Sequence, residues 1–150
     1  MKFVKTVVLA GLMSGILGGA AIAGGVKHLD TGKIYPQKLP VSEMVVAGDT
    51  LYLSGQIGNK PGTVKLVEGG MEAEAKQIME NIKANLENHG YSMANLVKCT
   101  ALLADITEWG TFNGIYKEYF EDGKYPARTA FEASGIPLGA RLEVECIGAK

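Results

Sequence analysis

Two short runs of alternating apolar and polar residues near the C-terminus constrain the fold most strongly. The first run covers residues 128–132 and the second residues 141–147. A turn-forming segment with two glycines and a proline separates them: Gly135, Pro137 and Gly139. Strand-like runs joined in this way are typical of a β-hairpin. We therefore expect the two runs to pair with each other.

The second run has one apolar and one acidic face. Leu142, Val144 and Cys146 share the first face, and Glu143 and Glu145 share the second, because successive strand side chains point to opposite sides of a sheet. In a half-buried sheet, the apolar face turns inward.

Arg128 follows Pro126 closely at the start of the first run. Its planar guanidinium could hold a substrate carboxylate through two parallel hydrogen bonds. The alternative is a surface ion pair with acidic neighbours, which contributes at most about 1 kcal/mol. The pattern alone leaves both interpretations open.

Residues 1–23 are typical of a secretory signal peptide. Two lysines near the start precede an uncharged apolar run, and Ala21 and Ala23 supply the small residues of a cleavage site. The run approaches the roughly 20 residues that span a bilayer, so a retained anchor is the alternative. We expect the leader to be removed. A mature domain of residues 24–150 would then be periplasmic or secreted, with no stable membrane anchor.

The composition argues against a nucleic-acid partner and a metal site. The leader carries two lysines and no acid, so its removal takes the formal net charge from −1 to −3. The remaining basic residues are scattered, which leaves no basic stripe for a phosphate backbone. With only His28 and His89, and no Cys-x-x-Cys spacing, we expect no zinc.

The two cysteines, Cys99 and Cys146, lie far apart in the sequence, in predicted strands. An oxidising compartment would permit a disulfide if the two Cα atoms came within about 7 Å. Both positions also suit a small buried hydrophobe, which is the common use of cysteine. We expect free, buried thiols, with a disulfide as the alternative.

The rest of the chain predicts an alternation of strands and helices. The expected elements are an irregular N-terminal arm over 24–39, strands over 41–46 and 51–57, a helix over 72–88, a strand over 96–103 and a helix over 108–120. Apolar residues recur in both helices at the spacing of one buried face: Ala75, Ile78, Met79, Ile82 and Leu86, then Trp109, Phe112, Tyr116 and Phe120. The order predicts one α+β domain, with two helices on one face of a mixed sheet. A second subunit would cover the other face, so we expect a homo-oligomer.

Three motifs resemble those of the RidA family, also called YjgF or L-PSP. They are Leu53-Ser54-Gly55-Gln56-Ile57-Gly58, Pro126-Ala127-Arg128-Thr129 and Arg141-Leu142-Glu143-Val144-Glu145-Cys146-Ile147. Asn113 and Tyr116 also match a family pattern, in which the asparagine lies close to the ligand pocket. The resemblance implies a chorismate-mutase-like homotrimer with ligand sites between subunits.

The resemblance also implies a chemistry. RidA-like proteins hydrolyse enamines and imines such as 2-aminoacrylate and 2-iminopropanoate to the 2-keto acid and ammonia, without a cofactor. By motif position, Arg128 would bind the substrate carboxylate and Glu143 would hold or polarise the attacking water. The carbonyl of Ala130 would orient that water or the substrate nitrogen, and Ser54 and Gly55 would line the neighbouring wall. An iminium carbon is already electrophilic, so positioning and a placed water are the main requirements.

Two features depart from the family pattern. Val41 stands where many members have an aromatic residue, so the aromatic lid is missing or supplied from elsewhere, and the pocket could be larger. The leader is the second departure, because the family's usual substrates arise in the cytoplasm from pyridoxal-phosphate dehydratases.

Three functions follow from these observations. The first is imine and enamine hydrolysis. The alternative is a non-catalytic trimer that binds small carboxylates or partner proteins. The third is ribonuclease activity, a label that some family members bear. The acidic mature chain and the lack of a histidine acid/base pair argue against it.

Overall fold

The computed structural model describes residues 25–36 and 39–150. The predicted signal peptide, residues 1–23, lies outside these ranges. Within them, no helix is long and apolar enough to cross a membrane.

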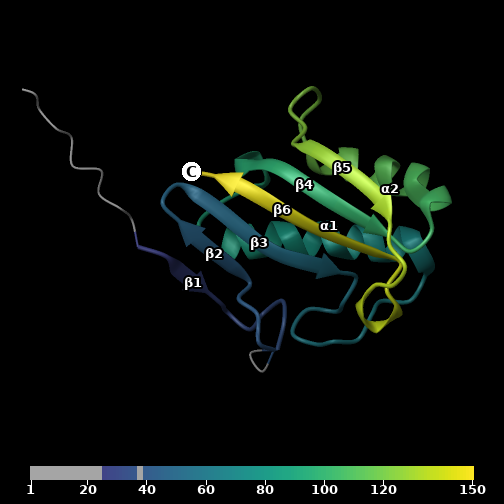
Figure 1. Ribbon diagram of the computed structural model, residues 1–150, viewed down its shortest axis with the longest axis horizontal. Coiled ribbons are helices and arrows are strands. Elements are labelled where there is room, and N and C mark those ends of the chain that lie inside the picture. Colours follow the sequence, from purple (N-terminus) through teal and green to yellow (C-terminus); the bar gives the residue numbers. More distant parts are fainter. Residues whose placement is uncertain (1–24, 37–38) are drawn as a thin grey trace, which may run out of the picture.

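One six-stranded sheet carries two helices on the same face (Figure 1). The strands are β1 (Lys27–Leu29), β2 (Met44–Ala47), β3 (Thr50–Ile57), β4 (Leu96–Leu103), β5 (Ala127–Glu132) and β6 (Leu142–Ala149). Their spatial order is β1-β2-β3-β6-β4-β5, in which β4 and β5 are parallel and the other neighbours antiparallel. The helices are α1 (Gly70–Asn88) and α2 (Trp109–Tyr116). The predicted α+β class with a mixed sheet is confirmed.

A single large core fills the space between the sheet and the helices. Alternate residues of β4 and β6 point into it: Cys99, Ala101 and Leu103, then Leu142, Val144 and Cys146. The predicted face of α1 is also buried, with Ala75, Ile78, Met79, Ile82 and Leu86 each at most 1% exposed. Each large aliphatic side chain buried in this way contributes about 1.5–3 kcal/mol. The apolar patterns of β6 and α1 were therefore correctly interpreted.

The expected hairpin between residues 128–132 and 141–147 is wrong. β5 pairs in parallel with β4, and β6 lies between β3 and β4. The connection between β5 and β6 contains a short 3-10 turn, Pro137–Gly139, and is long enough to pass β4, a lateral step of roughly 10 Å. The turn residues correctly indicated that the chain reverses its direction. They did not indicate which strand it pairs with afterwards.

The second helix, α2, begins at Trp109, one residue after the predicted start. It ends at Tyr116, before the predicted end at Phe120, and a 3-10 helix, Lys117–Tyr119, follows it. Asp105 caps the short 3-10 helix Ile106–Glu108 that leads into α2, because its Oδ1 accepts a hydrogen bond of 2.9 Å from the Thr107 N–H. Phe112 and Tyr116 are buried as expected, but Trp109 is 45% exposed, so its predicted packing role is wrong. Trp109 is the first residue of α2 and borders open cavities.

The expectation of free thiols is also wrong, because Cys99 and Cys146 form a disulfide. The two residues are directly opposite on the adjacent strands β4 and β6, and their Cα atoms are 4.1 Å apart. The bond joins residues 47 positions apart, and chain entropy alone would give such a loop about 4 kcal/mol of stabilisation. Strand register is a long-range property, so the sequence could not show this pairing.

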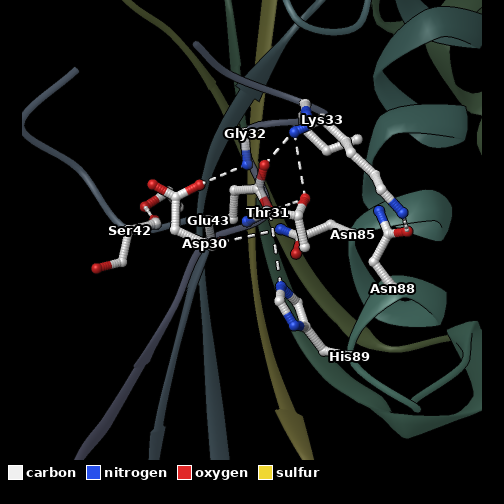
Figure 2. A network of polar contacts seen from close by, with 11 residues as sticks. Asp30, Thr31, Gly32, Lys33, Ser42, Glu43, Asn85, Asn88 and His89 are labelled. Atoms are coloured by element: carbon white, nitrogen blue, oxygen red, sulfur yellow. Dashed lines mark hydrogen bonds and ion pairs between the residues drawn. The ribbon is translucent and has the colours of Figure 1, made fainter. Parts of the chain in front are cut away.

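A buried carboxylate holds the N-terminal arm against the domain (Figure 2). Glu43 is 1% exposed. Its Oε2 accepts hydrogen bonds from the N–H and hydroxyl of Thr31 at 2.9 and 2.8 Å, and its Oε1 accepts one from the Ile34 N–H at 3.1 Å. Asn85 of α1 donates a hydrogen bond of 2.8 Å to the Glu43 carbonyl, and the His89 Nε2 lies 3.6 Å from Oε2. The arm, which was predicted to be irregular, thus contains the strand β1 at the sheet edge.

The ionisation of Glu43 is favoured in this setting. Burial alone would raise the pKa of Glu43, but the hydrogen bonds from Thr31 and Ile34 outweigh that effect, and the pKa lies below its usual range. The carboxylate is therefore charged at neutral pH, where it accepts all three hydrogen bonds from the arm.

The Glu43→Gln variant should lower the free energy of unfolding by about 2–4 kcal/mol at neutral pH, because an amide N–H₂ would face a buried N–H donor. The lowered pKa means that the contribution of Glu43 is fully present above the pKa of its unfolded form. It is lost as the pH falls through the folded pKa. Denaturant unfolding curves of the two proteins should therefore converge towards acid pH.

The matched control is Glu121→Gln, which removes an exposed carboxylate whose partner is Lys124. It should change the free energy of unfolding little at any pH. A difference between wild type and Glu43→Gln that stays constant down to acid pH would contradict the role given to the charged Glu43.

Candidate functional site

The predicted site residues gather at two separate places on the sheet. Arg128, Ala130 and Asn113 lie together where α2 covers the β5 edge. Val41, Ser54, Gly55 and Glu143 line a different cavity, beside β3 and β6. The structure thus brings the residues of each group together, but it keeps the two groups apart.

Arg128 is half-buried on β5 beneath α2. Its guanidinium carbon lies 4.3 Å from the ring centroid of Tyr116 and 5.1 Å from that of Phe112, which is a cation–π arrangement. Its Nη2 donates a hydrogen bond to Asn113 Oδ1. Burial lowers the pKa of Arg128, although a guanidinium remains charged at any ordinary pH.

The Arg128 charge has no carboxylate partner within residues 25–36 and 39–150. A cavity of about 370 Å³ beside it is walled by Trp109, Tyr116 and Tyr125. Another, of about 470 Å³, reaches from Arg128 to Ala130. The free N–H groups of a guanidinium in such an aromatic setting suit a small organic anion.

The Glu143 carboxylate lies in a third cavity, of about 410 Å³. Ser54 and Gly55 form part of its wall, at an irregularity in the pairing of β3 with β6. Such bulges change the direction of the backbone and are common beside active sites. A Cβ at residue 55 would overlap the Glu143 carboxylate, so the glycine gives that carboxylate its room.

The surroundings of Glu143 favour proton exchange. Burial raises the pKa of Glu143, and the negative charge of Glu145 acts in the same direction. A carboxyl group with a raised pKa in a cavity is suited to act as a general base or acid. In the part of the chain that the structure describes, no three His, Cys, Asp or Glu side chains gather as a metal site.

Tyr35 is a cavity residue that the sequence did not indicate. Its Oη donates a hydrogen bond of 2.6 Å to the Gly55 carbonyl, and its ring lines the cavity that Val41 borders. Burial raises the pKa of Tyr35 to about 12, and the charge of Glu143 adds to this effect. The aromatic side chain that position 41 lacks is thus present in the cavity, but it comes from the N-terminal arm.

Arg128 and Glu143 of one chain lie on opposite faces of the sheet. Arg128 contacts α2 and therefore points to the helix side. Glu143 precedes Val144, which is 0% exposed in the core, so Glu143 points to the other side. β4 also separates their strands, which places them roughly 10 Å apart laterally. One chain cannot bring both side chains onto the same small molecule.

Known proteins resemble this chain over most of its length. The 2-iminobutanoate/2-iminopropanoate deaminase of Bos taurus is 41% identical over 121 residues, which make up 81% of this chain and 88% of that protein. RidA from an Antarctic Psychrobacter is 34% identical, with a TM-score of 0.76 over 83% of this chain and 99% of that chain. Escherichia coli TdcF with bound serine is 27% identical, with a TM-score of 0.75 over 83% of this chain and 98% of that chain.

The family assignment follows from these similarities and from a match along the sequence. The model of the family described as Endoribonuclease L-PSP matches residues 35–150, which include both groups of candidate site residues. The chain therefore belongs to the L-PSP family, the RidA or YjgF family that its motifs resemble.

Proposed function

We propose that this protein hydrolyses 2-imino acids, and their enamine tautomers, to 2-keto acids and ammonia. The observation that carries the proposal is the half-buried Arg128 guanidinium, which lies on aromatic rings without a carboxylate partner among the described residues. A carboxylate from outside the chain would complete it. The relatives that are named as imine deaminases, such as the bovine protein at 41% identity, support this chemistry.

Each predicted residue has a role in this reaction. Arg128 binds the substrate carboxylate, and Asn113 orients the guanidinium through its Oδ1. Glu143 accepts a proton from water as the water oxygen attacks the imine carbon. Glu143 passes this proton, and then the proton of the new hydroxyl group, to the nitrogen. The carbon–nitrogen bond then breaks, and ammonia leaves as the ketone forms. Ala130 lines the same cavity as Arg128, and its carbonyl would orient the substrate nitrogen or the water.

The reaction needs Arg128 of one chain and Glu143 of another. The sheet face opposite the helices exposes large apolar side chains, with Tyr52 47%, Phe131 46% and Ile147 37% exposed. Apolar surface of this kind is typical of a subunit interface. We propose a homotrimer in which this face is covered by other copies, with the ligand site in the cleft between two of them.

We also propose that the mature protein works outside the cytoplasm, in the periplasm or as a secreted protein. The disulfide between Cys99 and Cys146 supports this location, because such bonds persist in oxidising compartments and are rare in the cytosol. The leader-like N-terminus agrees with it.

The Arg128→Ala variant should lower kcat/KM for imine hydrolysis about 100-fold, because the charge-assisted contacts with the substrate carboxylate are lost. The kcat/KM of Arg128→Lys should lie between those of wild type and Arg128→Ala, since lysine keeps the charge but not the planar guanidinium. Release of ammonia from a 2-imino acid generated in situ measures both. Lys83→Ala, which removes an exposed charge on α1, is the control.

Two results would contradict the proposal in different ways. Full activity of Arg128→Ala would remove the guanidinium from the mechanism. Binding of small carboxylates without turnover by the wild-type trimer, across several imino acids, would favour the non-catalytic alternative.

The Glu143→Gln variant should lose most of kcat and keep KM nearly unchanged, since the amide cannot take a proton from water. The raised pKa of Glu143 predicts that wild-type kcat falls on the acid side at a pH above the ordinary carboxyl range. This acid limb should be missing from the residual activity of the variant. A wild-type profile that stays flat through the carboxyl range would exclude Glu143 as the base.

A further inference from the structure

We infer that the cavity beside Glu143 receives the substrate side chain and selects 2-imino acids with branched apolar side chains, such as the imine derived from leucine. This inference rests on the proposed function and adds the substrate class. It comes from the lining of the cavity, the exposure of its rim and the way in which its aromatic wall is held.

The cavity is large and mostly apolar. Its volume of about 410 Å³ lies in the range of small-molecule sites. Its apolar lining consists of Leu39, Val41, Ile57, Val64, Pro137 and Leu138, together with the ring of Tyr35. A substrate with a single methyl group would leave most of this lining without an apolar contact from the substrate. A branched side chain of four carbons would cover more of it, and each added carbon can improve transition-state binding about tenfold.

The rim exposes apolar side chains that no part of the described chain covers. Val41 is 46%, Val64 45% and Leu138 60% exposed. Leu138 has a φ of 60°, a left-handed conformation that a leucine rarely adopts. Strained residues of this kind concentrate where ligands bind. Its conformation and exposure fit contact with an apolar ligand group.

The aromatic wall is fixed before any substrate arrives. Tyr35 is held at its hydroxyl by the Gly55 carbonyl. The residues just before it are held by the Glu43 carboxylate through Thr31 and Ile34 (Figure 2). The Gly55 backbone in turn lies against the Glu143 carboxylate. The Tyr35 wall and the Glu143 carboxylate therefore keep fixed positions relative to each other. This arrangement places the substrate side chain in the cavity while the imine carbon lies next to Glu143.

The test compares imines generated in situ from leucine and from alanine by an amino acid oxidase, with semicarbazide as a competing trap. Wild type should show a kcat/KM at least about tenfold higher for the leucine-derived imine. Val64→Phe fills the cavity from its rim and should lower the ratio of the two kcat/KM values about tenfold, mainly through KM of the larger imine. Val26→Phe, at a 62% exposed valine outside the cavity lining, is the matched control and should leave the ratio unchanged.

The outcomes separate this inference from the function on which it rests. If the protein turns over neither imine, the proposed function itself is wrong. Turnover that favours the alanine-derived imine, or a ratio that Val64→Phe does not change, would overturn the substrate class and leave the function standing. A Val64→Phe protein that changes its oligomeric state, with an unchanged ratio, would show that another copy covers the rim, which also overturns the inference.

Discussion

The alternation of side chains along β5 and β6 is the constraint on which the proposed mechanism depends. Val144 must point into the core, so Glu143 faces away from the helices. Arg128 must lie against α2 to contact Tyr116 and Phe112, so it faces the helices. A strand cannot turn one residue over without exposing its buried neighbours. The separation of the proposed base from the proposed anion site is therefore built into the sheet, and assembly of copies would have to overcome it.

Polar and covalent links stabilise the other half of the site. Glu43 holds the arm that carries Tyr35, and the disulfide fastens β4 to β6, the strand of Glu143. A buried carboxylate is tolerable only because several donors satisfy it. These links make the wall of the Glu143 cavity rigid. Without them, the sheet would place few constraints on the short N-terminal segment that carries Tyr35.

Sequence reasoning was reliable where a pattern depends on local periodicity. It identified the buried face of α1 and the inward face of β6, because each follows from residues a few positions apart. It failed where distant segments decide the outcome. The partner of β5, the opposed positions of Cys99 and Cys146, and the placement of Tyr35 beside Glu143 all depend on long-range register. The family motifs predicted the candidate residues but not their division between two faces of the sheet.

The central claim is that one site takes its guanidinium and its carboxylate from different chains, and co-expression of two inactive variants tests it most directly. Oligomers that contain both Arg128→Ala and Glu143→Gln chains should recover activity, because about a quarter of the randomly assembled sites would combine an intact Arg128 with an intact Glu143. Oligomers that contain only one of the two variants should stay inactive. If the mixed oligomers form but stay as inactive as the parents, both groups act within one chain and the account is wrong.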